Sequence, residues 1–301
     1  MCNHHIKTKD DLRSYISKFM IRMKDNLLQC KLTANLNNRI NAVVVSDIGR
    51  VRSNNEDNYI LGRHINEQFL DHSELLEYRS VTREKCYLAG VFDGIGGAEA
   101  GEIASKTAVE CFRESFERIS AAASKEKMDC ILRETFSEAN NRINLLQKKM
   151  GFIGTTGTVL LYYDGEFKIF HLGDSRAYLF HNDALYQITK DDTLSNMKIE
   201  MGIYLPDDPR VEWDKHKLTC FIGKNETMKN LELEESEWIP VVHGDQILLC
   251  SDGLSDMCSD NAISYVIQRN KSVQETAMDL VSLAKENGGE DNITCVLIKV
   301  R

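Results

Sequence analysis

Residues 157–189 constrain the fold of this chain more than any other segment. They form four short apolar runs, with Asp164-Gly165 between the first two and Asn182-Asp183 between the last two. Asp-Gly between alternating apolar runs is a strong signal for a β-hairpin turn, and Asn-Asp is a weaker one. The pattern therefore predicts an antiparallel meander over residues 157–189.

Further strands and helices are expected on both sides of this meander. Short runs rich in β-branched and aromatic residues predict strands, and apolar residues at spacings of three and four predict helices. The expected strands are 40–45, 86–92, 246–250 and 293–300, and the expected helices are 99–119, 125–150, 261–268 and 272–286. Antiparallel hairpins interrupted by two long helices indicate an α+β fold built in layers.

Two other segments differ in character from this core. Residues 11–28 have apolar side chains at helical spacing, and a polar stretch follows, so we expect an N-terminal amphipathic helix and linker over residues 1–38 and one domain over residues 39–301. The mixed charges of the helix favour packing on that domain over docking on a partner or an anionic membrane. Residues 191–233 lack a sustained period and contain Pro206 and Pro209, which indicates a long irregular insertion.

Composition narrows the class of protein. The 301 residues include 37 Lys and Arg against 46 Asp and Glu, a formal net charge of −9, which offers no obvious basic footprint for nucleic acid. Charges interrupt the N-terminus where a secretory signal is apolar, and no stretch reaches the ~18 apolar residues of a membrane helix. The nine cysteines include no Cys-x-x-Cys pair. We expect a cytoplasmic monomer without a membrane span that binds no nucleic acid.

Four aspartates stand where an apolar strand stops and a glycine or turn begins: Asp93, Asp174, Asp252 and Asp291. Taken singly, each is better explained by turn chemistry, because Asp is a common turn former. If the strands adjoin, however, the carboxylates converge, and like charges that close require protonation or a cation. All-oxygen clusters select Mg²⁺ or Mn²⁺ over zinc. The context shared by all four favours a metal site.

Six motifs in a fixed order carry a family resemblance. They are RSNNEDN from Arg52, VFDGIGG from Val91 with Gly101-Glu102 after it, GTT from Gly154, GDSR from Gly173, CSDGL from Cys250 and GEDNIT from Gly289. In order and spacing they resemble the metal-dependent protein serine/threonine phosphatases of type 2C, closest in style to the bacterial branch. The resemblance covers residues 41–301.

The resemblance implies a four-layer αββα sandwich, in which helices cover two facing, antiparallel-rich β-sheets and a binuclear metal site lies at one end. It implies two Mn²⁺ or Mg²⁺ ions, with a third ion in a weaker site. Gly94 would bind through its carbonyl, since a residue without a Cβ lets the backbone approach an ion. The implied ligands are Asp93, Gly94, Asp252 and Asp291, with Asp174 joining Asp252 in the third site.

The implied reaction is hydrolysis of phosphoserine and phosphothreonine in proteins by a metal-bridging hydroxide, which opposes a Ser/Thr kinase. Two cations lower the pKa of a bridging water and clamp the oxygens of an in-line displacement. Arg52 would bind the substrate phosphate, because a guanidinium offers it paired donors. Glu56 and Asp57 would hold metal-bound water. The implied partners are phosphorylated proteins and a cognate kinase.

The sequence departs from the family pattern in two places. Ile95 stands where eukaryotic relatives carry His and bacterial ones usually Met, and residues 191–233 match the family's mobile flap only at their opening and close. Two other functions stay open: a regulatory module on the same fold with a degenerate metal site, and a phosphoesterase acting on small molecules. The intact carboxylates of Asp93, Asp252 and Asp291 argue against the first.

Overall fold

The computed structural model describes residues 40–66, 74–76, 86–96, 100–224, 232–269 and 271–301. The predicted N-terminal helix and linker over residues 1–38 lie outside these ranges. Within them, none of the helices combines the length and the apolar character that crossing a membrane requires.

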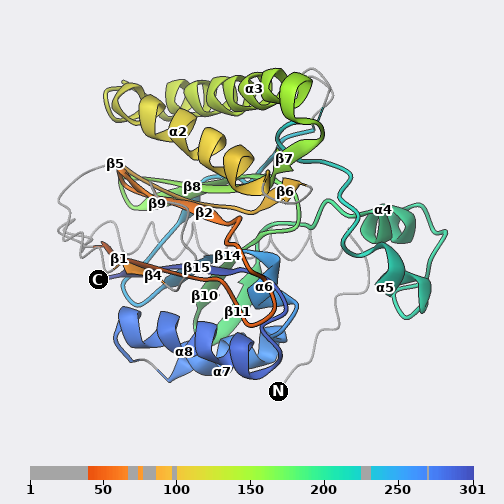
Figure 1. Cartoon of the computed structure of the whole chain (residues 1–301). Coiled ribbons are helices and arrows are strands. Elements are labelled where there is room, and N and C mark those ends of the chain that lie inside the picture. Colours follow the sequence, from red (N-terminus) through yellow and green to blue (C-terminus); the bar gives the residue numbers. More distant parts are fainter. Residues whose placement is uncertain (1–39, 67–73, 77–85, 97–99, 225–231, 270) are drawn as a thin grey trace.

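Two β-sheets stack face to face, and helices cover the outer face of each (Figure 1). Sheet I contains β1 (Ile40–Asp47), β4 (Glu74–Leu76), β10 (Arg176–His181), β11 (Ala184–Gln187), β14 (Gln246–Cys250) and β15 (Ile293–Val300). Sheet II contains β2 (Asn58–Leu61), β3 (His64–Ile65), β5 (Cys86–Phe92), β8 (Gly157–Tyr163), β9 (Glu166–Leu172), β12 (Glu234–Glu235) and β13 (Ile239–Pro240). Every pairing between these strands is antiparallel.

The strand order places β1, the first strand in the sequence, next to β15, the last. It is β11-β10-β14-β15-β1-β4 in sheet I and β12-β9-β8-β5-β2-β3 in sheet II, with β13 also on β9. A separate two-stranded ladder joins β6 (Gly94–Gly96) to β7 (Ile153–Thr155). Because β1 pairs with β15 along its whole length, motifs from the first and last parts of the chain meet at the same end of sheet I.

Helices complete the four layers. Sheet II is covered by α2 (Gly101–Ser120) and α3 (Lys125–Met150), and sheet I by α6 (Asp252–Ser255), α7 (Asp260–Gln268) and α8 (Val273–Glu286) (Figure 1). The rings of Phe92 and Phe136 both pack on Phe112 of α2, with centroids 5.1 and 4.9 Å away. The predicted αββα sandwich, with antiparallel-rich sheets, is confirmed.

Strand β15 shows why these strands are apolar on both faces. Its side chains alternate, as a strand's must. Val296 and Ile298 enter the core between the two sheets, while Cys295 and Leu297 enter the core beneath α7 and α8. A strand that is buried on both faces therefore appears in the sequence as a continuous apolar run.

Local signals account for several element boundaries. The strands β5, β14 and β15 and the helix α3 coincide with the predicted ranges. Ser124 caps α3 by accepting from the backbone of Lys127, and Ser272 and Glu275 form a reciprocal capping box at the start of α8. Such caps satisfy backbone donors that the first helical turn leaves without partners.

The predicted single meander is wrong. Both turns form as expected, since Asp164, Gly165, Asn182 and Asp183 all have positive φ. The first hairpin, β8–β9, lies in sheet II, however, and the second, β10–β11, lies in sheet I. The chain crosses between the sheets at residues 173–175. Turn chemistry specifies a hairpin but not the sheet that the hairpin joins, which depends on packing against distant strands such as β14.

The prediction of an irregular insertion over residues 191–233 is also partly wrong. It contains α4 (Leu194–Glu200) and α5 (Arg210–Asp214), which lie beside the sandwich in Figure 1. We call the described part, residues 191–224, the flap. The buried carboxylate of Asp214 holds it together by accepting from Lys198 (2.6 Å), Lys217 (2.8 Å) and the Tyr204 hydroxyl (3.0 Å). Helices this short, held by polar contacts, leave no apolar period to detect.

Candidate active site

The four strand-end aspartates converge on one cavity. Asp93 follows β5, Asp174 lies in the crossing between β9 and β10, Asp252 begins α6 directly after β14, and Asp291 precedes β15. All four line a cavity of about 650 Å³. The predicted residues Arg52, Glu56 and Gly94 line the same cavity. The structure therefore brings together, from five segments of the chain, the residues predicted to bind metal and phosphate.

Asp93 is held rigidly by the threonines of the GTT motif. Its backbone N–H donates to Thr156 Oγ1 (2.9 Å), and its carbonyl accepts from the Thr156 N–H and the Thr155 hydroxyl (both 2.8 Å). Thr156 Oγ1 also lies 2.7 Å from Ser175 Oγ, next to Asp174. These contacts link the strand end that carries Asp93 to the crossing that carries Asp174.

Burial and mutual repulsion make this a costly place for negative charge. Burial raises the pKa of Asp93 well above its ordinary value, and the carboxylates of Asp57 and Asp252 raise it further. Burial likewise raises the pKa of Asp174 and Asp291, and Asp252 is the strongest charged neighbour of both. A cation is the usual means by which such a cluster keeps its charge at neutral pH.

Glu56 and Asp57 occupy different positions, although they are adjacent in sequence. Glu56 lines the cavity, and burial followed by the neighbouring Glu102 raises its pKa. Asp57 is buried behind the cavity, where its Oδ2 accepts from the Ser251 hydroxyl (2.8 Å), and burial raises its pKa to about 7. Asp57 thus supports the residue that precedes Asp252.

The donor set fits a hard divalent cation. Two carboxylate oxygens at the site, Oδ1 of Asp57 and Oδ1 of Asp252, are buried without a hydrogen-bond partner in the described part of the chain. Buried polar atoms are normally satisfied, so orphaned carboxylate oxygens in an acidic cluster point to a bound cation. Oxygen donors of this type suit Mg²⁺ and Mn²⁺.

The structure shows why residue 94 is a glycine, for a reason that the sequence did not reveal. A Cβ at this position would lie 2.3 Å from the carbonyl oxygen of Gly101 and 2.7 Å from that of Glu56. The start of α2 therefore packs directly against the strand end that follows Asp93. This contact holds the Gly94 backbone at the edge of the cavity.

Arg52 reaches the cavity from a loop near the start of the chain. Its guanidinium donates to Asp291 Oδ2 over 2.6 Å, and its side chain is 52% exposed. An exposed guanidinium beside an acidic cavity can bind an incoming phosphate with the donors that Asp291 does not use.

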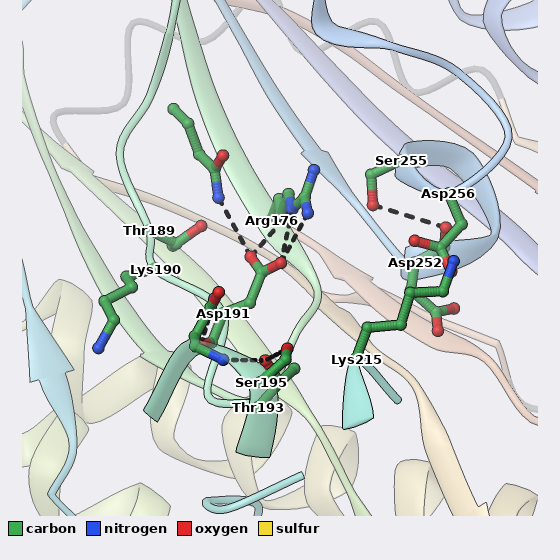
Figure 2. A network of polar contacts seen from close by, with 12 residues as sticks. Arg176, Thr189, Lys190, Asp191, Thr193, Ser195, Lys215, Asp252, Ser255 and Asp256 are labelled. Carbon is green, nitrogen blue, oxygen red and sulfur yellow. Dashed lines mark hydrogen bonds and ion pairs between the residues drawn. The ribbon is translucent and has the colours of Figure 1, made fainter. Parts of the chain in front are cut away.

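The base of the flap is fixed next to Asp174. Figure 2 shows Arg176 making paired contacts with the Asp191 carboxylate, of 2.9 Å from Nε and 2.6 Å from a terminal nitrogen. The next residue, Asp192, exchanges hydrogen bonds with the backbone of Gly173: its N–H donates over 2.7 Å and its carboxylate accepts over 3.0 Å. The flap therefore begins at the sheet crossing.

Sequence reasoning missed four polar residues of the cavity wall. Glu212, Lys215 and His216 come from the flap, and Asp256 follows α6. Figure 2 shows the Lys215 side chain next to Asp252 and Asp256. Asp256 could have been found, because it follows Asp252 by one helical turn. The flap residues carry no sequence signal, since only the folding of the flap brings them to the cavity.

Comparison with known proteins agrees with this geometry. A family model described as protein phosphatase 2C matches residues 76–297. The serine/threonine phosphatase stp of Listeria innocua is 28% identical over 257 residues, which are 84% of this chain and 93% of stp. The serine/threonine protein phosphatase PstP of Mycobacterium tuberculosis is 31% identical over 255 residues, which are 85% of this chain but 44% of PstP.

A solved structure adds a bound metal to the comparison. It is the catalytic domain of PstP in complex with two manganese ions, which matches with a TM-score of 0.66 at 28% identity and covers 87% of this chain and 99% of that one. The family match extends over most of the chain and includes the segments that carry Asp93, Asp174, Asp252 and Asp291. The chain therefore belongs to the protein phosphatase 2C family.

Proposed function

We propose that this chain hydrolyses phosphoserine and phosphothreonine in proteins, with two divalent cations, Mn²⁺ or Mg²⁺, as cofactors. The observation that carries the proposal is the convergence of four strand-end aspartates on one cavity with Arg52 at its side. Family membership supports it, as do the relatives stp and PstP, which are named serine/threonine phosphatases. Such an activity opposes a Ser/Thr kinase that acts on the same proteins.

The carboxylates would hold the cations. Asp93, Asp252, Asp291 and the Gly94 carbonyl would bind two ions, and Asp174 would bind a third together with Asp252. When bound, the ions lower the pKa of water and stabilise charge on the phosphoryl oxygens. The protein contributes rigid placement of the ligands, which the hydrogen bonds between Asp93 and Thr156 provide.

Arg52 would bind and orient the substrate phosphate. Its guanidinium donates to Asp291 on one side and is exposed on the other. It can therefore donate to an incoming phosphate without first breaking a buried ion pair. Glu56, which lines the cavity, would accept hydrogen bonds from water beside the phosphate. Asp57 would act indirectly, through Ser251, by fixing the start of α6.

A phosphate-release assay on a phosphothreonine peptide tests the proposal. We expect release with Mn²⁺, none in excess chelator, and a loss of about 100-fold or more in Asp252→Asn, since removing one stabilising group in a preorganised site commonly costs that much. Asp207→Asn is the matched control, because Asp207 is an exposed flap residue outside the cavity lining. Equal activity in excess chelator would refute the metal-dependent reaction.

Assays with small-molecule phosphates and with phosphopeptides distinguish the proposed function from the two alternatives, a small-molecule phosphoesterase and a regulatory module. Faster hydrolysis of nucleotides and sugar phosphates than of phosphopeptides would identify a phosphoesterase for small molecules. Binding of Mn²⁺ without hydrolysis of any phosphoester would identify a regulatory module on the phosphatase fold.

A further inference from the structure

We propose that the catalytic cavity contains an apolar subsite that selects phosphoproteins with an aromatic or large aliphatic residue within two positions of the phosphorylated serine or threonine. Four cavity-lining residues form this subsite, and we call them the apolar wall: Ile95, Phe152, Leu218 and Phe221. The inference rests on the proposed function, since it names the class of substrate that the same site prefers.

The apolar wall is accessible to an incoming substrate. Phe152, in the loop between α3 and β7, is 60% exposed, and Ile95, Leu218 and Phe221 are half-buried. A single exposed apolar residue needs no explanation, but a group of them in one cavity marks a binding site. Contact with a substrate side chain would remove this apolar surface from water, which favours binding.

Contacts within the protein keep the apolar wall in place. The rings of Phe152 and Phe221 pack edge to face, with centroids 5.7 Å apart. A Cβ at Gly154 would lie 2.6 Å from the Phe221 ring, so this ring rests directly on the backbone of β7. Thr155 of β7 also exchanges two backbone hydrogen bonds with Ile222, over 2.9 and 2.8 Å. The wall is therefore preorganised, which lowers the entropy cost of binding a side chain.

The apolar wall lies close to the residues proposed to hold the cations. Ile95 follows Asp93 by two positions, and two residues of chain span at most about 7 Å. Its strand partner is Gly154, whereas the partner of the proposed ligand Gly94 is Thr155. Consecutive Cα atoms of a bound peptide are about 3.8 Å apart, so residues one or two positions from the phosphoresidue lie within roughly the same distance. A substrate with its phosphate at the metal ligands can therefore place a neighbouring side chain on the wall.

Charge in the rest of the cavity favours an apolar partner over an acidic one. The lining includes the carboxylates of Glu212, Asp256 and Glu290. Lys215, in the same lining, already pairs with Glu212 over 2.8 Å. An acidic residue beside the phosphoresidue would meet these like charges, which lowers affinity. A basic residue would pair with Glu212 or Glu290, which are exposed, and exposed pairs contribute little. We therefore expect apolar residues to be preferred over both.

Rates on matched phosphothreonine peptides test the inference. The peptides differ only in carrying Phe, Leu, Ala, Glu or Lys at one of the two positions on either side of the phosphothreonine, and kcat/KM is measured for the full chain with Mn²⁺. At one of these positions or more, Phe and Leu should exceed Ala about 10-fold, because apolar contacts in an enzyme pocket commonly discriminate by that factor. Glu should fall below Ala.

Replacements of Phe152 assign the preference to the apolar wall. Phe152→Ala should bring the kcat/KM ratio of the Phe and Ala peptides close to unity, and Phe152→Leu should keep most of the wild-type ratio. Phe152→Lys should reverse the order of the Phe and Glu peptides, since an ammonium beside the cavity attracts a carboxylate. Tyr265→Ala is the matched control and should keep the wild-type ratio, because Tyr265 is a 66% exposed aromatic residue of α7 outside the cavity lining.

The outcomes distinguish this inference from the proposed function. Equal kcat/KM for the Phe and Ala peptides at every position, the same ratio in the wild type and Phe152→Ala, or a preference for Lys over Phe would each overturn the apolar subsite. If metal-dependent phosphate release persists in that case, the proposed function stands. Release from none of the peptides would overturn both.

Sedimentation velocity tests for a different occupant of the apolar wall. A wild-type dimer that Phe152→Ala dissociates, without any peptide preference, would show that a second copy of the chain covers the wall, and it would overturn the subsite. Thermal melting of each variant verifies that folded proteins are compared.

Discussion

The guanidinium of Arg52 donates to the carboxylate of Asp291 over 2.6 Å, although 239 positions separate the two residues in the chain. Pairing of β1 with β15 makes this contact possible, because it brings the first and last motifs to the same end of sheet I. The contact joins the residue proposed to bind phosphate to a residue proposed to bind metal.

Replacing Arg52 should weaken substrate binding more than it slows the chemical step. A phosphate clamp contacts the ground state and the transition state alike, so Arg52→Ala should raise KM about 10-fold with a smaller change in kcat. Arg52→Lys should recover only part of the loss, since lysine keeps the charge but not the paired donors. Stability should change by about 1 kcal/mol or less, because the ion pair is exposed. Steady-state kinetics with an unchanged KM and a collapsed kcat would contradict this role.

Removing the Asp93 carboxylate should stabilise the metal-free protein and abolish its stabilisation by metal. Burial and the surrounding carboxylates make charge at Asp93 unfavourable. In chelator, Asp93→Asn should therefore unfold at a higher urea concentration than the wild type, with a free energy of unfolding that is larger by about 1 kcal/mol. Saturating Mn²⁺ should stabilise the wild type by about 3 kcal/mol at 100 times its dissociation constant, and the variant by much less. Asp207→Asn serves as the control. An equal gain from Mn²⁺ in wild type and Asp93→Asn would show that Asp93 is no ligand.

His171 should make the protein less stable in acid. It is 1% exposed, its Nε2 donates to the Lys190 carbonyl (3.1 Å), and burial lowers its pKa to about 4. The unfolded chain, with a pKa near 6.5, binds the proton more readily. Neutral His171 therefore makes its full contribution to the free energy of unfolding above about pH 6.5. That contribution falls by roughly 3 kcal/mol as the pH drops to about 4.

Urea unfolding between pH 7.5 and 4.5 checks this expectation. His171→Gln should lose less stability than the wild type over that range, whereas the exposed His243→Gln should follow the wild type. Burial raises the pKa of Asp192 to about 7. Its contribution to stability therefore has the opposite pH dependence, because it is lost as the pH rises through that value. It is present in all three proteins and cancels in the comparison. Parallel pH dependences for wild type and His171→Gln would disprove the assignment.

Turnover should depend strongly on the leaving group. Ile95 lies in β6, opposite Gly154 in β7, and lines the cavity, where an aliphatic side chain cannot donate a proton to a departing alkoxide. An aryl phosphate should therefore be turned over about 100-fold faster than a phosphothreonine peptide. Ile95→His should narrow the gap by accelerating the peptide reaction, and Ile95→Leu should not. Equal kcat values on both substrates in the wild type would mean that another group already supplies the proton.

Deleting residues 1–31 should leave catalysis intact. Among the residues that the structure describes, those lining the cavity all lie at position 52 or later, so kcat/KM should stay within about twofold of the full chain. Melting temperature and solubility of the truncated protein are the controls. A truncated protein that is folded and soluble but inactive would show that the N-terminal segment completes the site.

Local sequence patterns predicted much of the fold because they act over short distances. The bounds of β5 and α3 match their predicted ranges. β5 is a short continuous apolar run, whereas α3 has apolar residues at helical spacing and begins after a capping serine. The turns at Asp164 and Asn182 form as expected, because backbone with positive φ favours Gly, Asn and Asp. The position of an aspartate after each of several apolar strands was likewise visible without a structure.

The sequence by itself therefore determined the layered α+β class, the individual hairpins and the candidate metal ligands. Only the tertiary structure decided which sheet each hairpin joins, that Arg52 pairs with Asp291, and that His216 lies beside Asp252 and Asp256. The physical reason is one of range: turn, cap and period preferences act between residues a few positions apart, whereas these contacts join segments that meet only when two sheets pack and the flap folds against their edge.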